Sequence, residues 1–382
     1  IGNFYAMQGL VSLFMPALMG IVADRWIPAQ RLLGVCHMLA GMLMLGVFLY
    51  TQTDAPSYPS LFALYSLSVA FYMPTLALSN SVAYTSLDQA GLDLVKSFPP
   101  IRVFGTVGFI CTMIAVSLLG LEATSGQFAV SAIISLVLAV YAQTLPNCPT
   151  APKGQSKSLV EALGLRAFVL FKQRKMALFF IFSMLLGVSL QITNGFANPF
   201  ISTFGEIPAY ADTFGVKYAN ILISLSQLSE TLCILLIPFA LRRFGIRRVM
   251  LIAMVAWVLR FALLGLGNPG SGVWLFLLSM IVYGVAFDFF NVSGSLFVDK
   301  ETDPSIRSSA QGLFMIMTNG IGATLGSLGA QAVINRFVYS QSEATAILSG
   351  WTTSWYVFAA YAAVVAVLFA VLFRYNTATE AK

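Results

Sequence analysis

Charged residues are scarce in this sequence. Asp, Glu, Lys and Arg make up 9% of its 382 residues, whereas an average soluble domain has about 25%. Histidine occurs once, and the four cysteines show no spacing typical of a metal site or a disulfide framework. Walker, nucleophile-elbow and His-Glu-x-x-His motifs are also missing. These absences argue against a soluble globular fold, against a bound metal and against an enzyme.

Long apolar runs take up most of the chain, and 58% of its residues are hydrophobic. A helix needs about 20 mostly apolar residues to cross a bilayer, where its backbone groups must bond within the segment. We therefore predict an all-α polytopic membrane protein with eleven spans. The expected spans are residues 3–23, 32–50, 60–86, 101–121, 128–145, 176–203, 218–241, 249–267, 274–297, 309–335 and 351–373.

A polar and basic stretch divides these runs into two groups. Residues 146–175 contain an amphipathic run at 159–168, and we interpret them as a linker between two helical bundles. The sequence thus predicts an N-terminal bundle at residues 1–145 and a C-terminal six-helix bundle at residues 176–382.

The basic residues predict the orientation in the membrane, because cytoplasmic connections carry the excess of Lys and Arg. Most of the basic connections fall on the side of the linker, and only Lys217 and Arg336 fall on the other side. The linker and the C-terminus should therefore be cytoplasmic. Topology also explains the net charge of +6 better than nucleic-acid binding does. We expect a multi-pass protein of a cell membrane, such as the bacterial inner membrane.

A loop signature follows the first span and consists of Gly20, Asp24, Arg25 and the later Arg31. A degenerate copy at residues 241–248 follows the second span after the linker. The signature resembles the G-x-x-x-D-R/K loop that the major facilitator superfamily has after the second helix of each half. The halves match if one helix is missing before residue 1, so we expect two six-helix bundles in the complete fold. Simple topology signalling is the alternative for these basic residues.

Four charged residues fall inside apolar spans, where a charge costs at least roughly 2.5 to 3.5 kcal/mol on insertion scales. They are Arg102, Glu230, Arg260 and Asp288. Such residues are functional candidates by default. Burial favours the neutral form of a carboxyl group, which suits Glu230 and Asp288 as proton carriers. Arg260 falls on a span that is peripheral in the expected fold, so we favour a structural role for it.

Amide side chains accompany these charges. Gln227 lies three residues before Glu230, and Gln191 and Asn194 are also three apart, so each pair shares a helical face. Amides and carboxylates can bond ribose hydroxyls and base edges. Ordinary interhelical hydrogen bonding is the alternative for these residues.

Two further groups of residues are candidates for the same site. Tyr283 and Phe287 lie close to Asp288 in one span, and their rings can stack on a flat ligand. In the N-terminal half, Arg102, Thr106 and Phe109 follow an i, i+4, i+7 pattern and form one helical stripe. In transporters built from repeats, the substrate site lies near the midplane between the halves.

Several stretches closely resemble the nucleoside:proton symporters of the major facilitator superfamily, nearly from end to end. They are residues 14–26, 98–110, 179–194, 225–232, 257–267 and 279–298. The resemblance implies import of a nucleoside by proton symport through alternating access, driven by the proton gradient without a cofactor, by a protein that acts as a monomer. It implies substrate contacts by Arg102, Thr106, Phe109, Gln191, Asn194, Gln227, Glu230, Tyr283 and Phe287, and proton coupling through Asp288 or Glu230.

Two other functions remain open at this point. A proton-coupled sugar or polyol transporter would use the same amides and carboxylates for hydroxyl groups and the same aromatic rings for a pyranose face. A non-transporting membrane sensor or scaffold is the alternative from another class. Competition by free ribose against uridine would distinguish a sugar or polyol transporter from a nucleoside transporter. Uptake of a solute by the full-length protein would exclude a sensor or scaffold.

Overall fold

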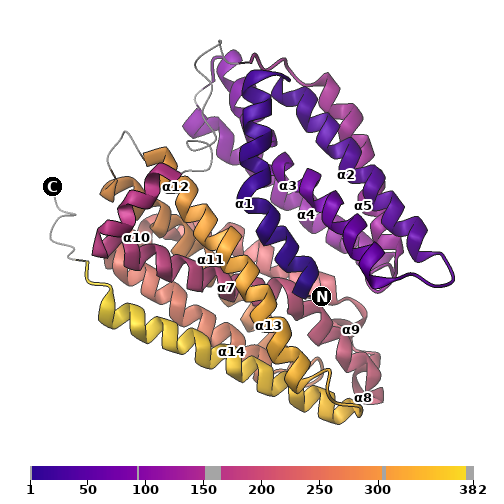
Figure 1. Cartoon of the computed structure of the whole chain (residues 1–382). Coiled ribbons are helices and arrows are strands. Elements are labelled where there is room, and N and C mark those ends of the chain that lie inside the picture. The colour runs from indigo at the N-terminus through magenta and orange to yellow at the C-terminus, as the bar shows by residue number, and fades with distance from the viewer. Residues whose placement is uncertain (1, 93, 151–164, 303–306, 376–382) are drawn as a thin grey trace.

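The computed structural model describes residues 2–92, 94–150, 165–302 and 307–375, and this part of the chain contains helices and no strand. Long helices run across the whole molecule and are joined by short connections (Figure 1). The expected linker segment 151–164, with most of its amphipathic run, lies outside the described residues. A short 3-10 helix, η2 (Leu165–Lys172), comes next in the chain.

The N-terminal half consists of five long helices. They are α1 (Gly2–Arg25), α2 (Ala29–Thr51), α3 (Tyr58–Gln89), α4 (Leu94–Leu118) and α5 (Gly126–Tyr141), followed by the 3-10 turn η1 (Ala142–Thr144). Helix α2 packs against both α3 and α5, and α1 packs against α3. A small apolar core joins these helices around Leu33, Cys36 and Val82.

The C-terminal half is larger and has a more aromatic core. Its elements are α7 (Arg174–Thr203), η3 (Phe204–Glu206), α8 (Pro208–Ala211), α9 (Phe214–Lys217), α10 (Ala219–Leu266), α11 (Val273–Glu301), α12 (Arg307–Met315), η4 (Ile316–Gly322), α13 (Ala323–Phe337) and α14 (Ala344–Leu372). Phe179, Phe200 and Trp355 are fully buried in this core. Lipid is as apolar as these side chains, so close packing rather than escape from water holds the helices together. This core and that of the N-terminal half are separate clusters.

Two of the expected spans are joined in α10. The backbone inside α10 leaves the helical region at Gly245, where φ is +74°. A positive φ costs little energy only for glycine, so Gly245 permits a sharp reversal between the two helical parts. The basic residues of the second loop signature surround this break.

Eight helices of the described part are long and apolar enough to cross a membrane. The two parts of α10 count as one among these eight, α4 contributes only a shorter apolar stretch at Val103–Leu118, and α1 is not among them. Each expected span nevertheless falls on a helix. The coarse prediction of an all-α membrane protein is therefore confirmed, while the count of eleven spans and the exact domain boundaries stay predictions.

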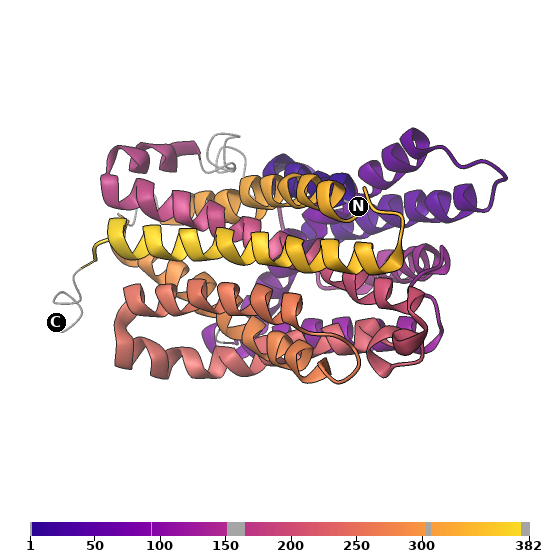
Figure 2. The same cartoon turned by 90° about the horizontal axis from the view of Figure 1, so that it is seen from below.

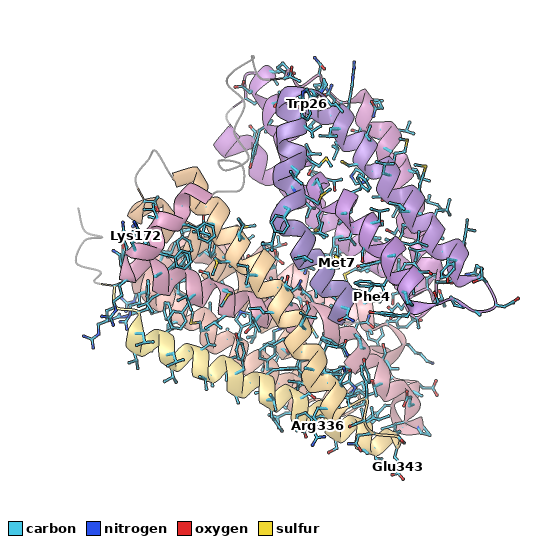
Figure 3. All side chains as sticks on the ribbon, in the orientation of Figure 1. Phe4, Met7, Trp26, Lys172, Arg336 and Glu343 are labelled. Atoms are coloured by element: carbon cyan, nitrogen blue, oxygen red, sulfur yellow. The ribbon has the colours of Figure 1, made fainter. Side chains whose placement is uncertain are left out.

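The two halves meet along two seams. Helix α1 packs against α13 and η4, and α4 packs against α10. Both views place the beginning of the chain beside α13 (Figures 1 and 2). At this seam the Gly2 amide donates to Gln331. At the seam between α4 and α10, Glu122, which follows α4, accepts a hydrogen bond of 3.1 Å from the backbone of Asn220. The halves diverge toward the end of the molecule that carries Trp26 and Lys172, away from the end that carries Arg336 and Glu343 (Figure 3).

Candidate functional site

A cavity of about 870 Å³ lies between the two halves, within the size range of small-molecule sites. Residues of α1, α3 and α4 form one wall, and residues of α7, α12, η4 and α13 form the other. Its polar lining residues are Gln8, Ser12, Ser79, Asn80, Gln191, Asn194 and Asn319. A cavity that both halves enclose in the middle of long apolar helices is the arrangement expected of a transport site.

The amide pair of α7 borders this cavity, as the sequence predicted for a shared face. Gln191 and Asn194 are both lining residues. The Asn194 Nδ2 donates to the Gln191 Oε1 over 3.2 Å, which orients the two amides together. Because an amide has both donors and acceptors, the pair keeps free bonding capacity toward the cavity.

The second predicted pair, the amide of Gln227 and the carboxylate of Glu230, lies on α10. Helix α10 is in close contact with α11. Ser229 Oγ donates to the carbonyl of Ile281, and a side chain at Gly284 would lie 2.5 Å from the Ser229 carbonyl. Glu230 follows Ser229 directly and acts electrostatically on Tyr283 and Asp288 of α11. Gln227 and Glu230 are half-buried and are not among the described residues that line the 870 Å³ cavity.

Tyr283 is held between aromatic and cationic groups. Its ring stacks on Phe287 with centroids 5.9 Å apart and 10° between the planes. Trp257 meets Tyr283 edge to face at 6.0 Å, and the Arg260 guanidinium lies 4.5 Å from the ring centroid. Such contacts fix the rings of α11 in one orientation. Of this group, Phe287 borders a small pocket beside the main cavity.

Asp288 lies deep in the C-terminal half. Its side chain is 3% exposed, and its Oδ2 has no hydrogen-bond partner among the described residues. Glu230 is the charged group that acts on Asp288 electrostatically, and both carboxylates act on Tyr283. A buried carboxylate is costly in an apolar span, so such a residue is a functional candidate. The predicted role of Asp288 and Glu230 in proton coupling stays a prediction.

Helix α4, which carries the predicted N-terminal site residues, forms part of the cavity wall. Ile101 and Gly105 line the cavity, and Thr106 lies between them and the half-exposed Phe109 on the same helix. Arg102 belongs to the same helix, within Leu94–Leu118, and its side chain is outside the described set. Helix α4 thus lines the cavity through Ile101 and Gly105, whereas Thr106 and Phe109 are not among the described lining residues, and the role of the predicted stripe stays a prediction.

The first loop signature lies where the chain turns from α1 into α2. Gly20 is in the last turns of α1, Asp24 and Arg25 end that helix, and Arg31 is exposed near the start of α2. The side chains of Asp24 and Arg25 are outside the described set. The backbone agrees with the expected turn after a span.

Sequence reasoning missed four amides that border the cavity or its side pocket. Gln8 donates to the Tyr65 hydroxyl over 2.9 Å, while Asn80, Asn291 and Asn319 come from three other helical segments. Their signal was present, because each is an amide within an apolar span. Nothing in the sequence ties these positions to one space, since they meet only after the helices pack.

The family model described as nucleoside H+ symporter matches residues 1–378 of the chain. The chain belongs to this nucleoside–proton symporter family. Xanthosine permease of Escherichia coli (strain K12) is 50% identical over 377 residues, which cover 98% of this chain and 88% of the permease. Nucleoside permease NupG of the same organism is 47% identical over 377 residues with the same coverage.

The family relationship extends to the structure. The chain resembles the crystal structure of a point mutant of the nucleoside transporter NupG with a TM-score of 0.91 and 45% identity, covering 98% of this chain and 90% of that chain. The predicted membership of the nucleoside–proton symporter family is therefore confirmed, together with a fold of the major facilitator type. The roles of the individual site residues stay predictions.

Proposed function

We propose that this protein imports nucleosides together with protons, by alternating access between its two helical halves. The observation that carries the proposal is the cavity of about 870 Å³ between the halves, with the Gln191–Asn194 pair on its wall and the buried carboxylate Asp288 in the same half. The family match and the related xanthosine and nucleoside permeases support a nucleoside as the substrate.

Residues of both halves take part in this mechanism. Amides and carboxylates bond the ribose hydroxyls and the base edge, and the aromatic rings stack on the base. The proposed substrate contacts are Arg102, Thr106, Phe109, Gln191, Asn194, Gln227, Glu230, Tyr283 and Phe287. Of these nine residues, Gln191 and Asn194 are among the described residues that line the cavity in this conformation, so closure of the halves around the substrate has to bring the other contacts to it.

Proton coupling uses the two neighbouring carboxylates. Asp288 or Glu230 takes up a proton from the outer side while the nucleoside binds, and releases it when the site faces inward. The electrostatic link between the two groups supports this assignment, because a change in the charge of one alters the cost of charging the other. The proton gradient is the driving force, and no cofactor is needed.

The proposed orientation places the basic end of the molecule in the cytoplasm. Arg31, Lys172 and Arg374 lie at or beside helix ends at this end of the molecule, whereas Lys217 and Arg336 lie at the other. The halves diverge at the basic end, so the cavity of this conformation would open inward. The proposal also includes eleven helical spans across the cell membrane and a C-terminus in the cytoplasm. The protein is proposed to act as a monomer.

Uptake of radiolabelled uridine into proteoliposomes tests the proposal. We expect uridine to accumulate when the outside is more acidic than the inside, and accumulation to collapse when an uncoupler is added. Free ribose in excess should compete poorly, because it lacks the base that the aromatic rings bind.

Empty liposomes under the same gradient are the control for leakage. Uridine entry that is equal with and without the gradient would contradict symport. Strong competition by free ribose would instead favour the sugar or polyol transporter.

A further inference from the structure

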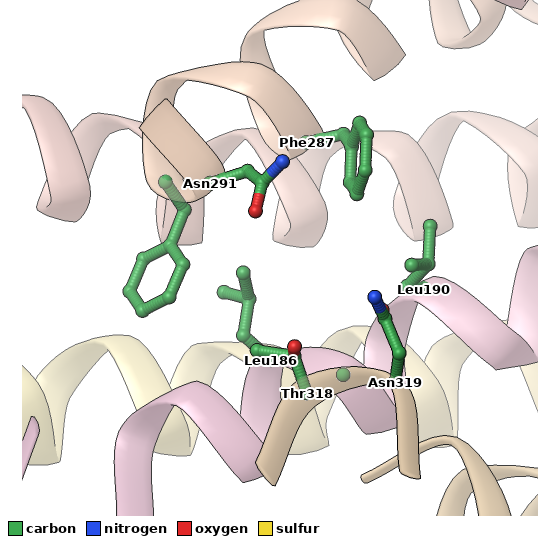
Figure 4. Close-up of a pocket in the computed structure, with 8 residues that line it drawn as sticks. Leu186, Leu190, Phe287, Asn291, Thr318 and Asn319 are labelled. Carbon is green, nitrogen blue, oxygen red and sulfur yellow. The ribbon is translucent and has the colours of Figure 1, made fainter. Parts of the chain in front are cut away.

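A small pocket adjoins the main cavity. It has a volume of about 20 Å³ and shares Leu190 and Asn319 with the larger space. Figure 4 shows that Asn291 and Asn319 enter this pocket from opposite sides, with the Phe287 ring near Asn291. A volume of this size holds about one water molecule or one polar substituent.

The backbone, rather than a flexible side chain, fixes one wall of the pocket. Asn319 lies in the π-helical segment η4, and such wide turns within α-helices occur frequently at functional sites. A side chain at Gly187 would collide with the Thr318 carbonyl. Helix α7 therefore lies directly against η4, and this contact determines where Asn319 points.

Asn319 presents an amide to the cavity, and among the described residues this amide has no strong hydrogen-bond partner. Its side chain is exposed, and the contact of its Nδ2 is with Met315 Sδ at 3.9 Å, a weak acceptor. An amide in an apolar span costs free energy unless water or a ligand satisfies it. Asn291 is four residues after Phe287 on α11 and so shares its helical face. Two amides and one ring thus converge on one space.

We propose that this pocket is a subsite for the polar edge of the nucleobase, in which Asn291 and Asn319 hydrogen-bond the base while its ring lies against Phe287. The inference rests on the proposed nucleoside transport and adds to it the two groups that read the base. Neither asparagine is among the contacts expected from the sequence.

The chemistry of an amide explains how such a subsite would treat different bases. Cytosine presents an amino donor and a ring-nitrogen acceptor, whereas uracil presents a carbonyl acceptor and a ring N–H donor at the same positions. An amide has an acceptor and two donors and can turn to match either pattern. A carboxylate only accepts, so it would match the amino group of cytosine and oppose the carbonyl of uracil.

The test compares the KM values of cytidine and uridine for Asn319→Leu and Asn319→Asp in proteoliposomes. Loss of a hydrogen bond to a buried polar group corresponds to about a tenfold change in binding. We expect Asn319→Leu to raise both KM values about tenfold with a smaller change in kcat. We expect Asn319→Asp to shift the KM ratio about tenfold in favour of cytidine.

Matched controls separate base reading from damage to the fold. Asn335 lies on α13 and pairs with Gln331 at an exposed position away from the pocket, so Asn335→Asp and Asn335→Leu should keep the KM ratio of the unmodified protein. A change in folding or in the rocking motion alters both nucleosides alike and leaves the ratio unchanged. Asn291→Asp repeats the test from the opposite wall if the Asn319 variants do not reach the membrane.

Unchanged KM values and an unchanged ratio in the Asp variants would overturn the proposal and leave the pocket to a water molecule. An equal rise in both KM values for Asn319→Asp would overturn it too, because it shows no discrimination at the base edge. If the unmodified protein carries neither cytidine nor uridine, the proposed function itself has failed. That result is distinct from a failure of the subsite.

Discussion

Arg260 is a charged residue in an apolar span, and it positions other site residues without lining the cavity. Its side chain is 2% exposed, and its Nη1 donates to the Ser279 carbonyl over 2.7 Å. Ser279 Oγ in turn donates to the Arg260 carbonyl over 3.1 Å, so the pair ties the second part of α10 to α11. The guanidinium also packs on Tyr283. These contacts support the structural role that we favoured from the sequence and make Arg260 a positioning residue for Tyr283.

Replacement of Arg260 should therefore destabilise the protein. Arg260→Ala removes the cation over Tyr283, leaves the Ser279 carbonyl without its donor and opens a cavity, and we expect a loss of about 3 kcal/mol in unfolding free energy. Arg260→Lys keeps the charge but loses the flat face that packs on the ring, so its loss should be smaller. Unfolding followed in detergent measures both.

Arg248 provides the control, because its side chain is exposed next to the break in α10. Arg248→Ala should change stability by less than about 0.5 kcal/mol. If Arg260→Ala were as stable as Arg248→Ala, the positioning role would be wrong.

At the scale of elements, glycines let α7 approach the segment formed by η4 and α13. Side chains at Gly187, Gly322 and Gly326 would collide with the backbone of Thr318, Met184 and Val188 respectively. Small residues allow such close packing of helices in a membrane. The close approach of α7 to this segment therefore rests on these glycines. The same segment also carries Asn319 into the cavity, which the sequence did not indicate.

A methyl group at this interface should separate the helices. We expect Gly187→Ala to lower the unfolding free energy by about 1–3 kcal/mol, as overpacking usually does, and to reduce uridine transport because η4 is displaced. Thermal unfolding and uptake of the same preparation measure the two effects.

Gly329 lies on α13 with open space around its missing side chain. Gly329→Ala should therefore be neutral or slightly stabilising, since alanine favours a helix. Equal stability of the Gly187 and Gly329 variants would contradict the account of this interface.

The elements differ in how far the sequence could predict them. Spans follow from apolar length alone, so each expected span falls on a helix. The reversal at Gly245 was predictable as a boundary between two spans, because the basic residues around it interrupt the apolar run. The π-helical segment was not predictable, because its wide turn depends on the contact with Gly187 from a distant helix. The orientation of Asn319 depends on that turn. The sequence therefore shows an amide in an apolar span but does not indicate that this amide faces the cavity.

At the scale of the whole molecule, each half has its own core, and the halves meet only along two seams. Such halves can move against each other as units. Each seam has a polar contact, Gly2 to Gln331 between α1 and α13 and the Asn220 backbone to Glu122 beside α4 and α10. Such contacts can break at little cost when water reaches them. The large aromatic core of the C-terminal half keeps α10 and α11 together during such a motion. The carboxylate pair therefore travels as one unit with the amides of α7.

The central claim is that protons and nucleosides move together, and proton movement driven by uridine tests it most directly. Proteoliposomes with a trapped pH dye and no initial pH gradient, with valinomycin and equal potassium on both sides to prevent a membrane potential, would receive uridine from outside. We predict that the lumen acidifies with the unmodified protein and that Asp288→Asn or Glu230→Gln abolishes the acidification. Entry of labelled uridine into the same vesicles without any acidification would contradict the account.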